Sequence, residues 1–446
     1  MKLWQKKFDT ATEVETFTVG KDRELDLLLA PFDVLGSIAH ASMLCKIGLL
    51  TTDENKALCV ELKNIYQEII KGNFRIDDNV EDIHSQIELI LTQRLGEAGK
   101  KIHTGRSRND QVLLDLKLYT RSEIKDVVSN TLTLFNKLID LSESYKEYLL
   151  PGYTHLQMAM PSSFGLWFGA YAESLVDDIT TLSAAYKVTN RNPLGSGAGY
   201  GSSFPLDREL TSKLLGFDSP NYNVVYSQMS RGKTERIVSA ALANIASTIG
   251  RMSMDICLYM NQNFGFISFP DNLTTGSSIM PHKKNPDVFE LIRAKCNRLQ
   301  VLPNELAMIC TNLPSGYHRD MQLIKESFIP AFAELNNCLN MMTFMLNQIV
   351  VKKDILEDPK YNDLFSVEAV NNLVLQGIPF REAYKIISES IANGNFERPK
   401  NNPLVSHTHT GSIGNLANDK IVSLMNETIS GFGFEKVDKA LSSLLG

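Results

Sequence analysis

Apolar residues recur every three or four positions through most of the middle of the chain. Four such runs extend from about Leu113 to Leu149, Arg236 to Tyr259, Phe289 to Ile309 and Phe328 to Ile349. This spacing puts the apolar side chains on one face of an α-helix, and none of the runs alternates as a half-buried strand would. Four helices of roughly 20 to 37 residues predict a long helical bundle.

Shorter helices are predicted before and after this bundle. Before it, the pattern predicts helices near Asp33 to Cys45, Thr52 to Lys71 and Val80 to Leu95, and after it short helices are joined by loops. The prediction is an all-α protein of three regions: an N-terminal helical domain at 1–104, a central bundle at 105–353 and a small C-terminal domain at 354–446. The long helices have broad Ala, Leu and Met faces, so burial against other subunits is expected.

Composition agrees with a soluble, folded globular protein. The 446 residues are 43% hydrophobic and 22% charged, and they are enough for two or three core-bearing regions. A net charge of -6 argues against general binding of nucleic acid or anionic membranes, so any anion site is local. The six cysteines show neither a C-x-x-C pair nor zinc spacing, and no signal core is visible at the N-terminus. These features favour a reduced, cytoplasmic protein.

A flexible, basic stretch, TTGSSIMPHKKNPDVFE (274–290), precedes the third long run. Gly276 loosens the backbone where two serines follow, and Asn285 with Pro286 predicts an N-cap and the first position of a helix. A helix N-terminus beside lysines attracts carboxylates, and in that field a serine can lose its proton and act as a base. The alternative is a solvated Gly-Ser loop with surface lysines.

Three further stretches are rich in polar groups. KKIHTGRSRNDQ (100–111) packs donors at the start of the first long run, or is simply a charged first turn. PGYTHLQMAMPSSFG (151–165) places His155 on a connection bounded by Gly and Pro, where a lone histidine is more often structural than catalytic. LPSGYHRDMQLIKE (313–326) spaces its polar groups as one helix face, which can equally be solvated. None of them is decisive alone.

Together these segments resemble the fumarase/aspartase superfamily, helical homotetramers that form or consume fumarate by β-elimination. The stretch after Gly276 is similar to the superfamily signature G-S-S-x-M-P-x-K-x-N, and GRSRNDQ at 105–111 resembles the form found in its argininosuccinate lyases. The resemblance covers about 19–330 and continues more weakly to the C-terminus. Similar segments are also DVLGSIAHASML (33–44), GYTHLQ (152–157) and NPLGSGAGYGSSFPLDRE (192–209).

The resemblance implies an elimination that yields fumarate and arginine from argininosuccinate, as in arginine biosynthesis. Ser277 matches the catalytic base, His155 the histidine on the acid side, and Glu290 the carboxylate that orients it. It also implies a homotetramer whose active sites are each built from three subunits, without a cofactor. The substrate-binding positions that it implies are Ser107, Arg108, Asn109, Thr154, Lys283, Asn285, Tyr317, Gln322 and Lys325.

No metal site is predicted. The only close pair of candidate ligands is HTH at 407–409, which we interpret as a polar loop with two exposed histidines. Two other functions remain open: another fumarate-forming lyase of the superfamily, which GRSRNDQ disfavours, and a structural tetramer like the lens crystallins, which the retained Ser277, His155 and Lys283 disfavour.

The chain departs from the resemblance mainly at SQMSRGKTERIV (227–238). An acidic-Arg-Asp-Phe run is usual there in argininosuccinate lyases and contacts the amino-acid end of the substrate, whereas this chain has Arg231 and Lys233. The sign of the charge is inverted. A substrate with an acylated α-amino group, above all a dicarboxylic acyl group, would match that inversion, and the alternative is that both side chains are surface charges. Smaller departures are Asp22, Met160 and His282.

Overall fold

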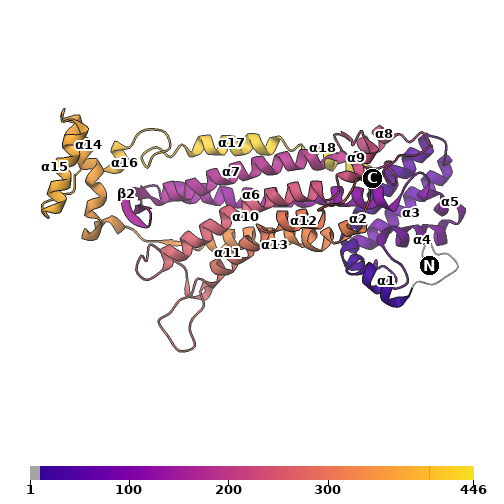
Figure 1. Cartoon of the computed structure of the whole chain (residues 1–446), viewed down its shortest axis with the longest axis horizontal. Coiled ribbons are helices and arrows are strands. Elements are labelled where there is room, and N and C mark those ends of the chain that lie inside the picture. The colour runs from indigo at the N-terminus through magenta and orange to yellow at the C-terminus, as the bar shows by residue number, and fades with distance from the viewer. Residues whose placement is uncertain (1–10, 401) are drawn as a thin grey trace.

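The computed structural model describes residues 11–400 and 402–446 and shows an elongated helical molecule (Figure 1). Four long helices pack side by side along its long axis: α6 (Arg108–Ser144), α7 (Phe164–Thr189), α10 (Lys233–Met260) and α13 (Ile324–Leu346). A fifth, α17 (Asn418–Ser430), lies along α7. The all-α class predicted from the periodicity is confirmed.

Shorter helices gather at the two ends of this bundle (Figure 1). One end holds α1 (Thr12–Val19), α2 (Asp22–Lys46), α3 (Thr52–Ile70), α4 (Ile83–Leu95), α5 (Glu97–Lys100), α8 (Arg208–Leu214), α9 (Val224–Met229) and α18 (Phe434–Leu445). The other end holds α14 (Ser366–Leu375), α15 (Phe380–Ala392) and α16 (Pro403–Ser406). Along the bundle, α11 (Asp287–Leu299) and α12 (Leu302–Ile309) pack on α10. Short 3-10 turns lie at Lys101–His103, Asp271–Leu273, Arg319–Gln322, Ile355–Glu357 and Pro359–Phe365.

The strands in the described part of the chain form three two-stranded ribbons. The antiparallel pairs are β1 (Leu149–Thr154) with β2 (Gln157–Ser163) and β5 (Ile267–Ser268) with β6 (Val350–Val351), and the parallel pair is β3 (Arg191–Asn192) with β4 (Ser219–Pro220). The first ribbon stands at the end of the bundle near α16 (Figure 1). It carries the segment that contains His155.

Buried apolar side chains form two separate clusters. The larger lies inside the bundle, with Phe135 of α6, Phe168 of α7 and Phe332 of α13 all about fully buried. The smaller joins α2, α3 and α4 around residues such as Leu58 and Ile65. Two clusters fit a chain of several core-bearing regions, while division at 104 and 353 stays a prediction.

Several predicted elements differ from the structure. The helix α7 was not predicted, since its aromatic and glycine residues obscure the helical period. The run from Phe289 to Ile309 is two helices, because Pro303 at the start of α12 cannot continue the hydrogen bonding of α11. The first long helix begins at Arg108 and ends at Ser144, before β1.

Among the described residues, one helix is long and apolar enough to cross a membrane, namely α2. However, 72% of its apolar stretch is buried inside the structure. Such burial is expected of the core helix of a globular protein, and α2 indeed packs on α3, α4 and α6.

Candidate active site

A charged cavity of about 170 Å³ lies where the N-terminal helices meet the bundle. The starts of α2, α4 and α6 form its walls together with the turn that leads into α13. These four segments, and a fifth that carries Arg231 between α9 and α10, are far apart in the sequence, and each places charged groups in the same small volume. The lining residues are Asp22, Asp26, Glu81, Asp82, His84, Arg108, Asn109, Val112, Arg231, Tyr317, Arg319, Gln322 and Lys325.

The start of α6 presents Arg108 and Asn109 to this cavity. Ser107 caps the helix: its Oγ accepts from Asn109 N at 3.3 Å, and Asp110 Oδ1 accepts from Ser107 N at 2.8 Å. The other oxygen of Asp110 accepts from Gly195 N at 3.0 Å, which ties the helix to the NPLGSG segment. Ser107 therefore fixes the helix start and does not itself line the charged cavity.

The guanidinium of Arg108 is held by residues at the start of α4. It lies 3.2 Å from Glu81 Oε2 and 3.1 Å from Asp82 Oδ2, and it donates to Ser85 Oγ at 2.6 Å. Asp82 is also the N-cap of α4, accepting from Ser85 N at 2.8 Å. Carboxylates thus balance the arginine and leave it ordered at the cavity edge.

On the opposite wall, Lys325 is almost fully buried between two carboxylates. Its Nζ lies 2.7 Å from Asp22 Oδ1 and 2.8 Å from Asp26 Oδ1. Burial opposes the charge on Lys325, but its ion pairs with Asp26 and Asp22 prevail and raise its pKa. Burial raises the pKa of Asp22 to about 6 although Lys325 acts against that shift. The Gln322 amide donates to Thr18 O at 2.8 Å.

Arg231 reaches the cavity from the turn between α9 and α10. Its side chain is 3% exposed, its Nη2 donates to Met321 O at 3.3 Å, and its guanidinium lies 5.5 Å from the Tyr317 ring centre. Nε and Nη1 have no hydrogen-bond partner in the part of the chain that the structure describes. Lys233 is different: it is exposed, lies 5.5 Å from the Tyr226 ring centre and, although it shares a second groove with Arg231, does not line the charged cavity. Of the predicted pair, only Arg231 lines the charged cavity.

The segment with Thr154 and His155 forms the tip of the hairpin of β1 and β2. Thr154 pairs with Gln157, so His155 and Leu156 are the whole loop, and their φ angles are 53° and 58°. Two positive φ angles in a two-residue loop are the pattern of a type I′ turn, which is unusual without Gly or Asn. The hairpin exposes His155 to solvent.

Ser277 lies on a loop (274–286) that connects the end of the 3-10 turn at 271–273 to α11 and stands away from the bundle (Figure 1). Ser277 Oγ accepts from Ile279 N at 3.3 Å and from Met280 N at 3.2 Å. Two backbone donors on one hydroxyl oxygen would stabilise its deprotonated form, which suits a base. The Lys283 side chain is exposed on the same loop.

Asn285 does not cap α11 as predicted. The helix begins at Asp287, with Pro286 at the cap position. The Asn285 amide instead donates to Thr275 Oγ1 and to Gly276 O, both at 3.3 Å, and so closes the base of the loop. Glu290 is exposed in the first turn of α11. It lies on a different element from the hairpin that bears His155.

The structure therefore brings some predicted residues together and leaves others apart. Arg108, Asn109, Arg231 and the segment around Lys325 share the charged cavity. The hairpin stands at the opposite end of the bundle, and the Ser277 loop projects from its side (Figure 1). The sequence interpretation missed the cavity residues Asp26, Glu81, Asp82, His84 and Arg319 as site residues; the signal was charged groups such as Asp26 inside an otherwise apolar helix.

The histidines at 407–409 differ from the expected pair of exposed side chains. His407 is half-buried, and its Nε2 lies 2.8 Å from Glu368 Oε1. Among the described residues, one other group has the spacing of metal ligands: Asp33, His84 and Asp115. It lies next to the charged cavity, because His84 belongs to both.

Comparison with known proteins identifies the family. Residues 5–301 match the lyase family. The argininosuccinate lyase of Phocaeicola vulgatus is 60% identical over 445 residues, which is 100% of this chain and 99% of that protein. That of Thermotoga neapolitana is 39% identical over 388 residues, covering 87% of this chain and 98% of that protein.

Solved structures share the fold at low identity. EDDS lyase in complex with formate superposes with a TM-score of 0.75 at 20% identity, covering 98% of this chain and 94% of that one. A class II fumarase from Schistosoma mansoni superposes with a TM-score of 0.71 at 17% identity, covering 93% and 95%. The chain belongs to the fumarase/aspartase superfamily of helical lyases. Within that superfamily it belongs to the argininosuccinate lyases.

Proposed function

We propose that the protein is a carbon-nitrogen lyase that converts argininosuccinate to fumarate and arginine in arginine biosynthesis. The observation that carries this function is the full-length 60% identity to argininosuccinate lyases. The charged cavity supports it through Arg231, whose buried guanidinium has two nitrogens without a hydrogen-bond partner among the described residues and suits a substrate carboxylate. The other cations of the cavity, Arg108, Arg319 and Lys325, are already ion-paired with carboxylates. The structural-tetramer alternative is not favoured.

In the proposed elimination, Ser277 Oγ removes a proton from the carbon next to a carboxylate of the succinyl group. The extra negative charge then sits on that carboxylate as an aci-carboxylate, for which Lys283, Asn285 and Thr154 are donors. The C–N bond breaks, its electrons leave with the guanidino nitrogen, and His155, oriented by Glu290, supplies the proton to the leaving group. Arg108, Asn109, Tyr317, Gln322 and Lys325 bind the rest of the substrate, and Ser107 holds the start of α6, the helix that carries Arg108 and Asn109.

We infer that the working enzyme is a homotetramer with shared active sites. A single chain holds the charged cavity, the His155 hairpin and the Ser277 loop in three places, so none of them is complete alone. A groove of about 400 Å³ between α7 and α10, lined by Tyr171, Asp178 and Arg251, offers these bundle helices to another copy. A soluble cytoplasmic enzyme that acts on a small molecule fits this assembly.

A second candidate substrate is argininosuccinate with an acylated α-amino group. The observation that favours it is Arg231, which is buried, lines the cavity and has two guanidinium nitrogens without a hydrogen-bond partner among the described residues. Asp22 and Asp26 are also in the cavity, but both are ion-paired to Lys325. Arg231 thus suits an added carboxylate better than an ammonium group.

Turnover of the purified chain on argininosuccinate, followed by the absorbance of fumarate, tests the function. Adenylosuccinate, aspartate and malate are assayed beside it, and fumarate from one of these but not from argininosuccinate would overturn the proposal. N-succinyl-argininosuccinate tests the substrate. A charge-assisted pair with Arg231 predicts a preference of about ten- to a hundredfold in kcat/KM for the acylated compound.

The matched variants are Arg231→Gln and Lys233→Gln, because both residues lie in the same turn but only Arg231 faces the cavity. Arg231→Gln is expected to abolish the preference for the acylated compound, and Lys233→Gln to keep it. Equal preference in all three proteins, or no preference in the native chain, would show that the acyl group is not recognised here.

A further inference from the structure

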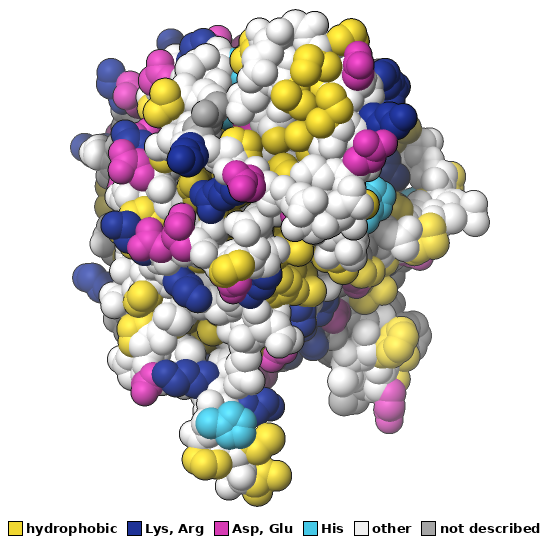
Figure 2. Space-filling model, turned by 90° about the vertical axis from the view of Figure 1, so that its left-hand side faces the viewer, with side chains coloured by type: hydrophobic (Ala, Val, Ile, Leu, Met, Phe, Trp, Pro, Cys, Tyr) yellow, Lys and Arg dark blue, Asp and Glu magenta, His cyan; other side chains and the backbone are white. Residues whose placement is uncertain are grey.

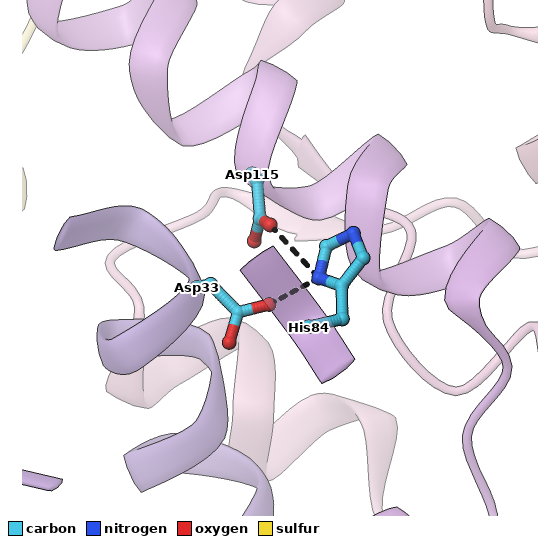
Figure 3. A group of neighbouring side chains, drawn as sticks. All are labelled: Asp33, His84 and Asp115. Carbon is cyan, nitrogen blue, oxygen red and sulfur yellow. Dashed lines mark hydrogen bonds and ion pairs between the residues drawn. The ribbon is translucent and has the colours of Figure 1, made fainter. Parts of the chain in front are cut away.

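Beneath the charged cavity, three side chains from three helices meet in the protein interior (Figure 3). They are Asp33 of α2, His84 of α4 and Asp115 of α6, and they are 2%, 7% and 1% exposed. His84 Nδ1 is hydrogen-bonded to Asp33 Oδ2 and lies 3.6 Å from Asp115 Oδ2. Figure 3 shows both carboxylates pointing at the same ring nitrogen. Groups so deeply buried must compensate one another.

The same three helices form part of the wall of the charged cavity. α2 supplies Asp22 and Asp26, the start of α4 supplies His84 itself, and α6 supplies Arg108 and Asn109. The contacts of His84 therefore join these three helices directly under the place where the substrate is proposed to bind. A shift of α4 against α2 or α6 would change the shape of the cavity.

Arg108 depends on α4 most directly. Among the described residues, its guanidinium contacts Glu81, Asp82 and Ser85, at 3.2, 3.1 and 2.6 Å, all in or just before the first turn of that helix. His84 lies within the same turn, and its ring ties this turn to α2 together with two weaker or more distant links, Ile83 N to Asp26 Oδ2 at 3.4 Å and Arg23 Nε to Val80 O at 2.8 Å. The anchoring of His84 therefore contributes to the position of the Arg108 guanidinium.

The two carboxylates are not equivalent. Burial opposes ionisation of Asp33, but the charge and hydrogen bond of His84 prevail and lower its pKa. Burial and the neighbouring Asp33 carboxylate raise the pKa of Asp115 well above its usual range. Burial opposes the charge on His84, but Asp33, helped by Asp82 and Asp26, outweighs burial and raises the pKa of His84. Arg106 adds a second positive charge beside Asp33 and Asp115.

We propose that Asp33, His84 and Asp115 form a positioning triad in which the Asp33 carboxylate holds the His84 ring by a direct hydrogen bond and Asp115 lies 3.6 Å from the same ring nitrogen. The triad fixes the first turn of α4 and, through it, the Arg108 guanidinium that binds substrate. This role rests on the proposed function of the cavity. A divalent cation is the competing occupant of these ligands, but the His84 nitrogen and the Asp33 oxygen are already in direct contact, and Arg106 repels a cation.

The test makes the same isosteric change, Asp to Asn, at each of the two carboxylates that face the His84 ring. Asp33→Asn removes the charge that holds His84, whereas Asp115→Asn keeps the shape and hydrogen-bonding pattern of a protonated carboxyl. With argininosuccinate, Asp33→Asn is expected to raise KM about tenfold or more and to change kcat less than about threefold, as for lost ground-state binding through Arg108. Asp115→Asn is expected to have a much smaller effect: the increase in KM that it causes should be at least about ten times smaller than the increase caused by Asp33→Asn.

His84→Asn is the conservative third variant, because its amide can donate where Nδ1 does but carries no charge. It is expected to behave as Asp33→Asn. If Asp33→Asn does not fold, the double variant Asp33→Asn/His84→Asn replaces the ion pair by two neutral amides and gives the KM reading instead. Metal content of the native chain and of Asp33→Asn is measured by mass spectrometry.

Equal KM effects of Asp33→Asn and Asp115→Asn would overturn the triad, and so would a loss confined to kcat. If the native chain contains one divalent ion per chain and Asp33→Asn contains none, the three residues form a metal site and the triad is wrong. An inactive native chain overturns the proposed function instead. In that case calorimetric binding of fumarate to the same variants still decides the triad, with weaker binding for Asp33→Asn than for Asp115→Asn expected, and the absence of that difference overturning it.

Discussion

Asp22, Asp26 and Lys325 place three charges in one buried corner of the cavity. The pair of Lys325 with Asp26 is 3% and 2% exposed, and Asp22 makes a second pair from the cavity side. One lysine charge cannot offset the burial of two carboxylate charges, so burial disfavours the ionised form of one of the two carboxylates. The raised pKa of Asp22, about 6, shows that Asp22 is that carboxylate. A polar substrate group placed there would reduce the cost of burial.

We predict that, as the pH rises, the unfolding free energy of the native chain falls relative to that of the Asp22→Asn variant. The folded pKa of Asp22, about 6, lies above the ordinary aspartate pKa of 3.8, so the folded state binds the proton more tightly than the unfolded state. That contribution to stability is complete below about pH 4 and is lost as the pH rises through 6. Between pH 4 and 7 the unfolding free energy of the native chain should fall against that of Asp22→Asn by on the order of 3 kcal/mol.

Denaturant unfolding of both proteins at matched concentration across that pH range measures the difference. A constant difference from pH 4 to 7 would mean that Asp22 keeps an ordinary pKa in the folded protein.

At the scale of elements, long amphipathic helices could be predicted because their apolar period is strong over many turns. α6, α10 and α13 follow from it, whereas α7 does not, since its buried face includes Gly165, Gly169 and several aromatic residues. Candidate residues such as Ser277 came from short motifs. Asp82 and His84 could not be found that way, because a buried charge gains its meaning from partners on other helices. The relative placement of packed helices cannot be predicted from the sequence of any single helix.

A single glycine sets the direction of the turn that carries Arg231. Gly232 has φ +78°, and a Cβ there would meet Cys310 Sγ too closely and Ile324 Cδ1 at 3.3 Å. Its N–H donates to Glu235 Oε2 at 2.6 Å, which starts α10. Only glycine satisfies both the left-handed backbone and the close packing, so this element needs it.

Gly232→Ala is therefore predicted to cost about 2 to 4 kcal/mol of stability, the sum of backbone strain and overpacking. Gly48→Ala is the matched control, because Gly48 has φ +80° but nothing within 4 Å of the added Cβ, and it should cost about 1 to 2 kcal/mol. Adding Cys310→Ala to Gly232→Ala should recover the overpacking part only. Equal losses for Gly232→Ala and Gly48→Ala in thermal unfolding would show that packing against Cys310 is not limiting.

At the scale of the whole molecule, the separation of the three groups is the main structural fact about function. The charged cavity lies at one end of a long bundle, the His155 hairpin lies near the other, and the Ser277 loop projects from the side (Figure 1). Figure 2, which looks along the bundle from the hairpin end, shows apolar side chains interspersed with charged ones on that end. Exposed apolar side chains such as Leu156 at the hairpin tip and Ile279 on the Ser277 loop, 79% and 82% exposed, are expected to be covered by other copies.

This arrangement predicts that two inactive variants restore activity when mixed. Ser277→Ala alone should lower kcat by about two orders of magnitude or more through loss of the base, and His155→Asn should lower it through loss of the acid. If the two residues of one site come from different subunits, random assembly of equal amounts leaves about a quarter of the sites with both native residues. Refolding the variants together should thus recover about a quarter of native activity, whereas refolding each alone should recover almost none. If both residues served one site from the same chain, the mixture would stay as inactive as its components, and the shared-site tetramer would be wrong.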